Sequence, residues 1–230
     1  MRQRHQKIMN IEQVRFNMVE QQIRTWDVLD TDVLDLLHTL KRENFVPPAQ
    51  REFALMDIEI PLSSVVATTT EKMWTPKMEA RVAQDVGLTG SEHVLEIGTG
   101  SGYLTGLLAS RAARVTSVEI NPDLAKFAAD NLARAGIVNA TIITGDGARG
   151  WAGLAPFDVI VFAGSMEVLP DEVLAQVKAG GRVFAIVGKL PVMKAQLFTL
   201  SAHGGVHTKT LFETVVAPLA NGAKAPGFVF

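Results

Sequence analysis

The sequence predicts an α/β fold: a doubly wound, seven-stranded sheet that ends in an antiparallel hairpin and follows a helical N-terminal elaboration. Two observations carry this prediction. From Val94 onward, short apolar runs typical of strands alternate with helical stretches, which favours a parallel sheet with helices on both faces. After residue 187 the helices stop, and only residues 203–205 separate two β-like runs, 196–201 and 207–218. We therefore expect the last strand to enter the sheet antiparallel.

Composition limits the functional classes. The 22 basic and 24 acidic residues give a net charge of −2, so no overall positive field attracts nucleic acid or an anionic membrane. The absence of cysteine excludes disulfides, thiolate zinc sites and cysteine nucleophiles, and we expect no metal site. The longest apolar runs, 159–163 and 183–187, are too short to span a bilayer. Residues 1–7 are basic but do not lead into the apolar segment of a secretory signal, so we expect a cytoplasmic protein.

Residues 1–88 are expected to form the helical elaboration. Apolar side chains recur every three to four positions over residues 11–23, which is typical of an amphipathic helix. Asp30 is placed to cap a second helix that runs to Leu40. Two separate helices are therefore predicted before the first proline pair.

The second part of the elaboration has a weaker pattern. Residues up to Ser64 lack a period, so we expect irregular structure there, with a turn at 59–62. Thr75 followed by proline predicts the N-cap of a third helix, which ends at Gly87.

Residues 89–230 are expected to form one compact unit around the sheet. Strands are predicted at residues 93–97, 114–119, 140–144, 157–162 and 182–187, with helices from 103 to 110, from 122 to 135, and after residue 170.

A glycine-rich loop follows the first of these strands. Gly98, Gly100 and Gly102 have the spacing GxGxG, which lets the backbone take positive φ values and approach a ligand closely. Tyr103 stands where the third glycine of a nicotinamide-binding fingerprint belongs, and the hairpin replaces a further crossover helix, so an NAD-dependent oxidoreductase is disfavoured. The loop alone is equally compatible with a tight turn that binds nothing.

Three acids stand at the ends of the first three predicted strands. Glu96 immediately precedes the loop, Glu119 closes the second strand and Asp146 follows the third. In an open α/β sheet a ligand binds beyond the carboxyl ends of the strands. We expect Glu119 to accept from two ribose hydroxyls, Asp146 to accept from an exocyclic amine or meet a sulfonium-bearing amino acid, and Glu96 to order the loop or an ammonium group.

Acids and bare backbone suit a ligand that carries an amino acid, a ribose and an adenine but no phosphate. S-adenosylmethionine is such a ligand. The expected cofactor-binding residues are Glu96, Gly98, Thr99, Gly100, Ser101, Gly102, Tyr103, Glu119, Ile120, Asp146 and Gly147.

These motifs resemble those of class I S-adenosylmethionine methyltransferases, which have a Rossmann-like sheet. The general likeness lies in residues 94–103, 118–119, 145–147 and 157–161. More narrowly, the chain resembles the protein-L-isoaspartate O-methyltransferases over residues 10–219, through segments 18–23, 45–47, 59–62 and 212–219. The resemblance implies methylation of the carboxyl group of isoaspartyl residues for protein repair.

One segment departs from that family. Where the family has a Thr-Ile-Ser-Gln-Pro-like sequence, this chain has Lys72–Pro76, and Trp74 falls at the position of the serine whose hydroxyl lies beside the transferable methyl group. Thr75 or the run ending at Thr70 is the alternative source of a hydroxyl. Trp74, Thr75 and Thr70 are thus the candidate catalytic residues, although Thr75 also has a purely structural interpretation as a helix cap.

Methyl transfer from a sulfonium is an in-line displacement, so the protein contributes mainly alignment and exclusion of water. A carboxylate acceptor is ionised at neutral pH and needs no general base. No histidine pairs with an acid, since the histidines are scattered along the chain. The expected partner is an isoaspartyl protein or peptide.

Two alternatives remain open. The acceptor is a small-molecule carboxylate or hydroxyl in the first, and the chain is a catalytically silent cofactor-binding module in the second. Nucleic acid and membrane are not expected as partners, and the sequence does not assign an oligomeric state.

Overall fold

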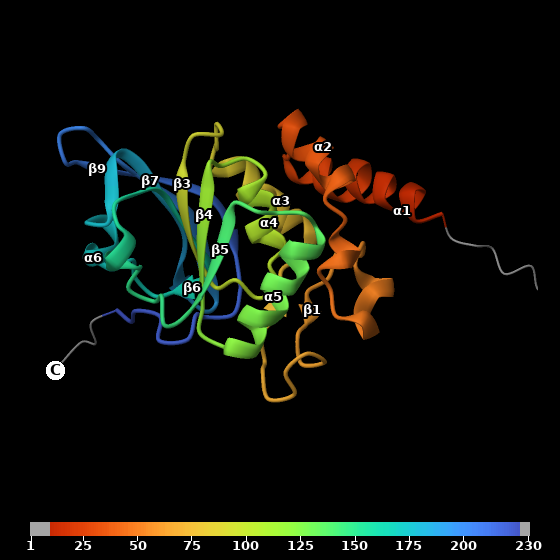
Figure 1. Cartoon of the computed structure of the whole chain (residues 1–230). Coiled ribbons are helices and arrows are strands. Elements are labelled where there is room, and N and C mark those ends of the chain that lie inside the picture. Colours follow the sequence, from red (N-terminus) through yellow and green to blue (C-terminus); the bar gives the residue numbers. More distant parts are fainter. Residues whose placement is uncertain (1–9, 226–230) are drawn as a thin grey trace, which may run out of the picture.

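A computed structural model of the chain describes residues 10–225 (Figure 1). Its main sheet has the strand order β5-β4-β3-β6-β7-β8-β9. The strands are β3 (His93–Ile97), β4 (Arg114–Glu119), β5 (Ala140–Thr144), β6 (Phe157–Met166), β7 (Val177–Lys189), β8 (Val192–Leu200) and β9 (Val206–Thr214). The first five are parallel, while β8 runs antiparallel to β7 and β9 antiparallel to β8. The predicted α/β class, the seven strands and the terminal hairpin are confirmed, and β8 is the strand that opposes the parallel set.

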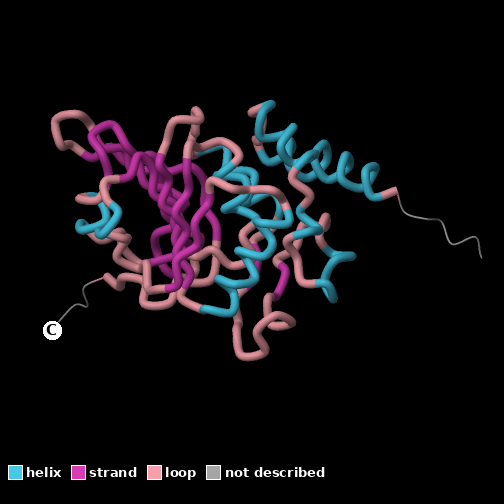
Figure 2. Tube along the Cα trace, viewed as in Figure 1, coloured by secondary structure: helices cyan, strands magenta, loops and turns pink. Residues whose placement is uncertain are grey.

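Alternating side chains of the strands build two separate cores. Val94 of β3 belongs to the core under the helices α3 (Pro76–Asp85), α4 (Tyr103–Ala109) and α5 (Pro122–Arg134). Leu95 belongs to the core on the opposite face, which the short helix α6 (Asp171–Leu174) covers. Figures 1 and 2 show this asymmetry: most helices lie on one side of the sheet.

The N-terminal helices form an outer layer against α3 and α4. Helix α1 (Ile11–Met18) continues as a π-helical turn (Val19–Ile23) and a 3-10 turn (Arg24–Trp26), and is followed by α2 (Thr31–Thr39) and two 3-10 helices, Arg42–Asn44 and Pro48–Phe53. The apolar side chains of this layer belong to the same continuous core as α3, α4 and one face of the sheet. Asn10, Asp30 and Thr75 cap their helices through side-chain oxygens, as the sequence predicts for Asp30 and Thr75.

Residues 59–64 differ from the prediction. Ile60–Pro61 form strand β1, which pairs antiparallel with β2 (Lys72–Met73), so the predicted turn at 59–62 is wrong. The reason is an alternating pattern over three residues: Ile60 and Leu62 are fully buried and Pro61 is exposed. The pairing brings the segment before α3 to the edge of the glycine loop.

The chain after β9 returns to the end of β6. The Ser165 N–H donates to the carbonyl of Ala217 at 3.0 Å, and the Leu219 N–H donates to the carbonyl of Ser165 at 2.9 Å. This return places Leu219 at the carboxyl end of the parallel strands, although it lies far from the other strand ends in sequence.

Within residues 10–225, no helix combines the length and the apolar character that crossing a membrane requires.

Candidate functional site

An outer hollow opens at the carboxyl ends of β3, β4 and β5. It contains about 570 Å³ of space that protein atoms do not fill, counted out to open solvent. The residues that line it are Glu71, Lys72, Ile97, Gly98, Gly100, Val118, Glu119, Ile120, Gly145, Asp146, Gly147, Ala148, Ala163, Leu219 and Ala220.

Glu119 lies at the centre of this edge and holds the glycine loop. Its Oε2 accepts from the Gly100 N–H at 2.8 Å, and its Oε1 accepts from the Asn121 N–H at 3.0 Å. Each carboxylate oxygen keeps a further lone pair for a hydroxyl donor. Because the backbone fixes both oxygens, the carboxylate is already oriented before a ligand arrives.

Asp146 follows β5 and also lines the outer hollow. Its Oδ1 accepts from the Ala148 N–H at 2.9 Å, and its Oδ2 accepts from the Asn221 side-chain amide at 2.9 Å. The second bond ties the returning C-terminal segment to the end of β5.

The glycine loop itself has positive φ at all three glycines, 94° at Gly98, 55° at Gly100 and 83° at Gly102. Gly102 also lies close to α5, since a Cβ placed there would come within 3.2 Å of the carbonyl oxygen of Ala128. Gly98 and Gly100 present bare backbone to the outer hollow. The GxGxG spacing therefore serves both the loop conformation and its packing on α5.

Glu96 lies behind the loop and does not line the outer hollow. It is fully buried, and its Oε2 accepts from the hydroxyls of Thr105 and Ser117 at 2.5 and 2.7 Å. Its Oε1 has no hydrogen-bond partner among the described residues. Burial raises the pKa of Glu96 to about 7, against the hydroxyl hydrogen bonds and with a further contribution from the charges of Glu119 and Glu79. The structure thus separates Glu96 from Glu119 and Asp146, which lie together.

Among the other predicted cofactor-binding residues, some line the outer hollow and others are buried away from it. Ile120 is exposed at the outer hollow and Gly147 lines it. Thr99 is buried with its hydroxyl 2.6 Å from that of Ser117. Tyr103 is buried in the helical core, where its ring packs against Phe45 with the centroids 5.3 Å apart. The prediction that these residues bind a cofactor stays a prediction.

A second, inner hollow continues from the first. The two hollows share Lys72, Gly98, Gly100 and Ala163, and the inner one is further lined by Met73, Trp74, Glu79, Thr99, Ser101 and Leu104. The two hollows therefore adjoin at the glycine loop, with Glu119 and Asp146 lining the outer one and Glu79 lining the inner one.

The sequence pattern does not distinguish Glu79 from the other polar residues of helix α3. Its side chain is buried in α3, and its Oε2 accepts from Arg42 Nε at 2.9 Å. Burial raises the pKa of Glu79 to about 7 even though the Arg42 guanidinium works in the opposite direction. Its burial depends on a partner 37 residues earlier, so no local pattern reveals it.

The candidate catalytic residues do not converge on one point. Trp74 is 9% exposed and separates the inner hollow from a groove beside Trp26 and Thr214. The Thr75 hydroxyl accepts from the Met78 N–H as the cap of α3 and faces that groove. Thr70 is exposed and lines neither hollow. Their catalytic role remains a prediction.

Several residues that line the outer hollow escaped the sequence analysis. Glu71 and Lys72 arrive through the short β1–β2 pairing, and Leu219 arrives through the return of the chain to β6. Partial desolvation, followed by the charge of Glu119, raises the pKa of Glu71. Two recognised segments contain a signal for these residues: 212–219 ends at Leu219, and 59–62 contains β1, whose Pro61 pairs with Lys72. Among residues 10–225, no three histidine, aspartate or glutamate side chains are arranged to hold a metal ion.

Comparison with known proteins agrees with this geometry. Residues 13–224 match the family model of protein-L-isoaspartate(D-aspartate) O-methyltransferase (PCMT). A protein-L-isoaspartate O-methyltransferase of Brucella anthropi is 37% identical over 79% of this chain and 81% of its own length. That of Myxococcus xanthus is 40% identical over 70% of this chain and 74% of its own length.

Solved structures support the fold. One protein-L-isoaspartate O-methyltransferase superposes with a TM-score of 0.74 at 24% identity, over 91% of this chain and 65% of that chain. A β-aspartate methyltransferase (PCMT) from Plasmodium falciparum, in complex with S-adenosyl-L-homocysteine, gives 0.72 at 19% identity, over 92% of this chain and 98% of that chain. With the family model matched along nearly the whole described structure, the chain belongs to the protein-L-isoaspartate(D-aspartate) O-methyltransferase family.

Proposed function

We propose that the protein binds S-adenosylmethionine in the two joined hollows and transfers its methyl group to the side-chain carboxylate of an isoaspartyl residue. The carrying observation is the pair of backbone-held acids, Glu119 and Asp146, beside a glycine loop that presents bare backbone. No lysine or arginine other than Lys72 lines the outer hollow among the described residues, which suits a ligand without phosphate. The cofactor would supply an electrophilic methyl group on a sulfonium, which is a good leaving group.

Each part of the two hollows has a defined task. Glu119 accepts from the ribose hydroxyls while it holds the loop, and Asp146 accepts from the adenine amine. Gly98 and Gly100 allow the backbone to lie against the ligand without side chains in between. Since the acceptor carboxylate is ionised at neutral pH, the protein aligns it and excludes water, and no residue has to remove a proton.

The test is methyl transfer to a synthetic isoaspartyl peptide with methyl-labelled S-adenosylmethionine. We expect base-labile methyl esters on the isoaspartyl peptide and none on the peptide of the same sequence with ordinary aspartate. Equal background labelling of both peptides would contradict the proposed acceptor.

A second acceptor class is favoured by one observation, the bulky buried indole of Trp74 at the acceptor side of the inner hollow. This ring reduces the space where the family has a serine, which suits a smaller carboxylate or hydroxyl acceptor. A Trp74→Ser variant separates the two possibilities. Isoaspartyl methylation that rises in this variant indicates that the native acceptor is the smaller one, whereas a fall indicates that Trp74 helps to position a peptide.

A further inference from the structure

The inner hollow contains a buried carboxylate whose hydrogen-bonding capacity is only partly used. Among residues 10–225, Arg42 Nε is the only group that donates to Glu79. The other guanidinium nitrogens of Arg42 donate to backbone carbonyls, those of Ala54 and Trp74. One oxygen of Glu79 is therefore left for another donor, in a hollow that also contains the glycine loop.

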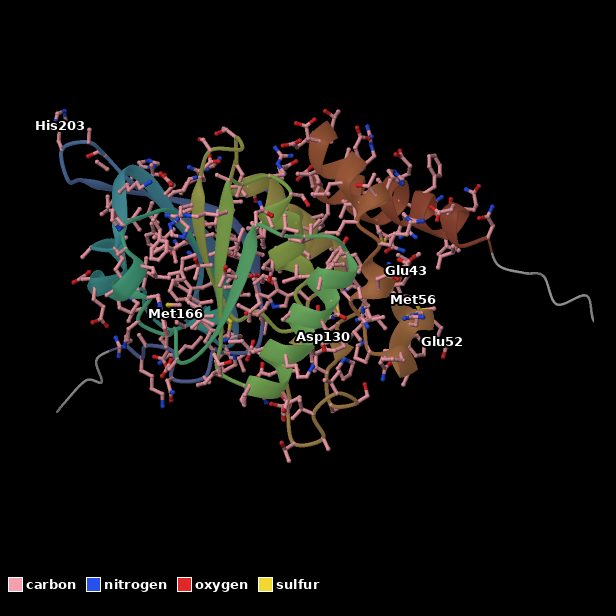
Figure 3. The ribbon with its side chains drawn as sticks, viewed as in Figure 1. Glu43, Glu52, Met56, Asp130, Met166 and His203 are labelled. Carbon is pink, nitrogen blue, oxygen red and sulfur yellow. The ribbon has the colours of Figure 1, made fainter. Side chains whose placement is uncertain are left out.

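In a second buried arginine–glutamate pair, both carboxylate oxygens accept hydrogen bonds from the arginine. Arg15 and Glu43 form two parallel hydrogen bonds, from Nη1 to Oε2 at 3.0 Å and from Nη2 to Oε1 at 2.6 Å. Although burial opposes ionisation, the hydrogen bonds from Arg15 lower the pKa of Glu43. Glu43 lies on the α1 side of the molecule, and it lines neither hollow (Figure 3). Two-point pairing thus satisfies Glu43 inside the protein, whereas one-point pairing does not satisfy Glu79.

The inner hollow contains more buried acidic than basic charge, because Lys72, the lysine that lines it, pairs with Glu59 at 3.2 Å. Glu79 and Glu96 are both buried, the charge of Glu79 contributes to the raised pKa of Glu96, and Arg42 is the cation that pairs with Glu79. The Glu96 Oε1 atom also has no hydrogen-bond partner in the described part of the chain. Buried carboxylates without full compensation are costly, which favours a positively charged group in the ligand.

We infer that Glu79 binds the α-ammonium group of the cofactor and so selects ligands that carry an intact amino-acid end. This inference rests on the proposed function, and it implies one orientation of the cofactor in the two hollows. With ribose at Glu119 and adenine at Asp146, the amino-acid end enters the inner hollow, where Ser101 and Glu79 line the wall. The Ser101 hydroxyl can donate to the ligand carboxylate, while the free oxygen of Glu79 accepts from the ammonium.

The test measures affinities of the full chain for three ligands by calorimetry: S-adenosylhomocysteine, its analogue with hydrogen in place of the α-amino group, and 5′-methylthioadenosine, which lacks the amino-acid end. In Glu79→Gln we expect the affinity for S-adenosylhomocysteine to fall about 10- to 100-fold, the range for a hydrogen bond to a charged group. The affinities for the other two ligands should stay within a factor of about two of the wild type.

Glu43→Gln is the matched control, because it removes the same group from the other buried arginine pair. It should lower the melting temperature and leave all three affinities unchanged. If Glu79→Gln does not fold, Glu79→Asp keeps the charge opposite Arg42 but retracts the carboxylate, and the same selective loss is expected.

Unchanged discrimination between S-adenosylhomocysteine and the deaminated analogue would overturn the role of Glu79. A wild-type protein that binds none of the three ligands would instead refute the proposed function.

Discussion

At the scale of single residues, the acids of the site fall into two kinds. Glu119 and Asp146 lie at the outer hollow with both oxygens held by N–H donors. Glu96 and Glu79 are buried deeper, and their pKa values are raised to about 7 mainly by burial. Carboxylates that line the outer hollow and are oriented by N–H donors suit ligand hydroxyls and amines. Glu96 instead accepts from the hydroxyls of Thr105 and Ser117 behind the glycine loop, and Glu79 pairs with Arg42.

Replacing Glu119 with glutamine should weaken cofactor binding. The amide has one acceptor oxygen, so it cannot serve both the Gly100 and Asn121 N–H groups, and the loop loses a charged acceptor. We expect the affinity for S-adenosylhomocysteine, measured by calorimetry, to fall at least about 10-fold. Asp130→Asn, which removes an exposed charge from α5 (Figure 3), is the control and should bind as the wild type does. Equal affinities of Glu119→Gln and wild type would refute this role.

Glu96 should make the protein less stable as the pH rises. Its carboxyl has a pKa of about 7 in the folded state against 4.5 as the reference, so the folded state binds more protons between these values. Stability is then highest below pH 4.5 for this group and decreases as the pH rises to 7. The Glu96→Gln variant lacks this loss, so its free energy of unfolding relative to wild type should increase between pH 5 and pH 8 by up to about 3 kcal/mol. Denaturant unfolding at several pH values measures it, and a pH-independent difference would contradict the assignment.

At the scale of elements, the glycine loop depends on its contact with α5. Asn131 of α5 is fully buried and its amide donates to the carbonyls of Ser101 at 2.9 Å and Phe45 at 3.3 Å. The same helix thus holds the loop and one of the N-terminal segments. Displacing α5 would move the loop away from the outer hollow.

Gly102→Ala tests this contact. The new Cβ would require positive φ in a non-glycine residue and would lie within 3.2 Å of Ala128. Gly136 also has positive φ, but nothing lies within 4 Å of a Cβ there, so Gly136→Ala isolates the backbone cost, about 1 kcal/mol. In denaturant unfolding, Gly102→Ala should lower the free energy of unfolding by at least about 1 kcal/mol more than Gly136→Ala does, because neighbouring atoms must also move. Equal losses would show that α5 does not restrain the loop.

A helix or strand can be predicted from the sequence where neighbouring residues alone determine it. The bounds of β3, β4 and β5 agree with the sequence, because each is a short apolar run between turn-forming residues. Strands β6 and β7 extend beyond their apolar centres, since bulges and pairing with the returning chain lengthen them. The β1–β2 pair was missed because each strand has two residues and pairs across a long loop.

The site shows the same limit. Glu119 and Asp146 could be located from the sequence because Glu119 ends β4 and Asp146 follows β5, both strands of the parallel set. Glu96 shares a strand face with Val94 under α4, so the alternation of β3 already indicated its burial. Glu79 could not be identified, since its environment is made by Arg42 from a distant segment.

At the scale of the whole molecule, we propose that the sheet edge binds the cofactor and that the acceptor approaches from the side of the N-terminal layer. Trp74 and Arg42 connect the two, because the Arg42 guanidinium donates to the Trp74 carbonyl at 2.6 Å and also pairs with Glu79. His203, at the tip of the hairpin, lies on the side of the molecule opposite Glu43 (Figure 3).

The most direct test of the central claim is a crystal structure of the protein with S-adenosylhomocysteine. We expect the ribose hydroxyls within hydrogen-bond distance of Glu119, the adenine beside Asp146 and the amino-acid end in the inner hollow. Density for the ligand outside the joined hollows, or with its ribose away from Glu119, would contradict the account.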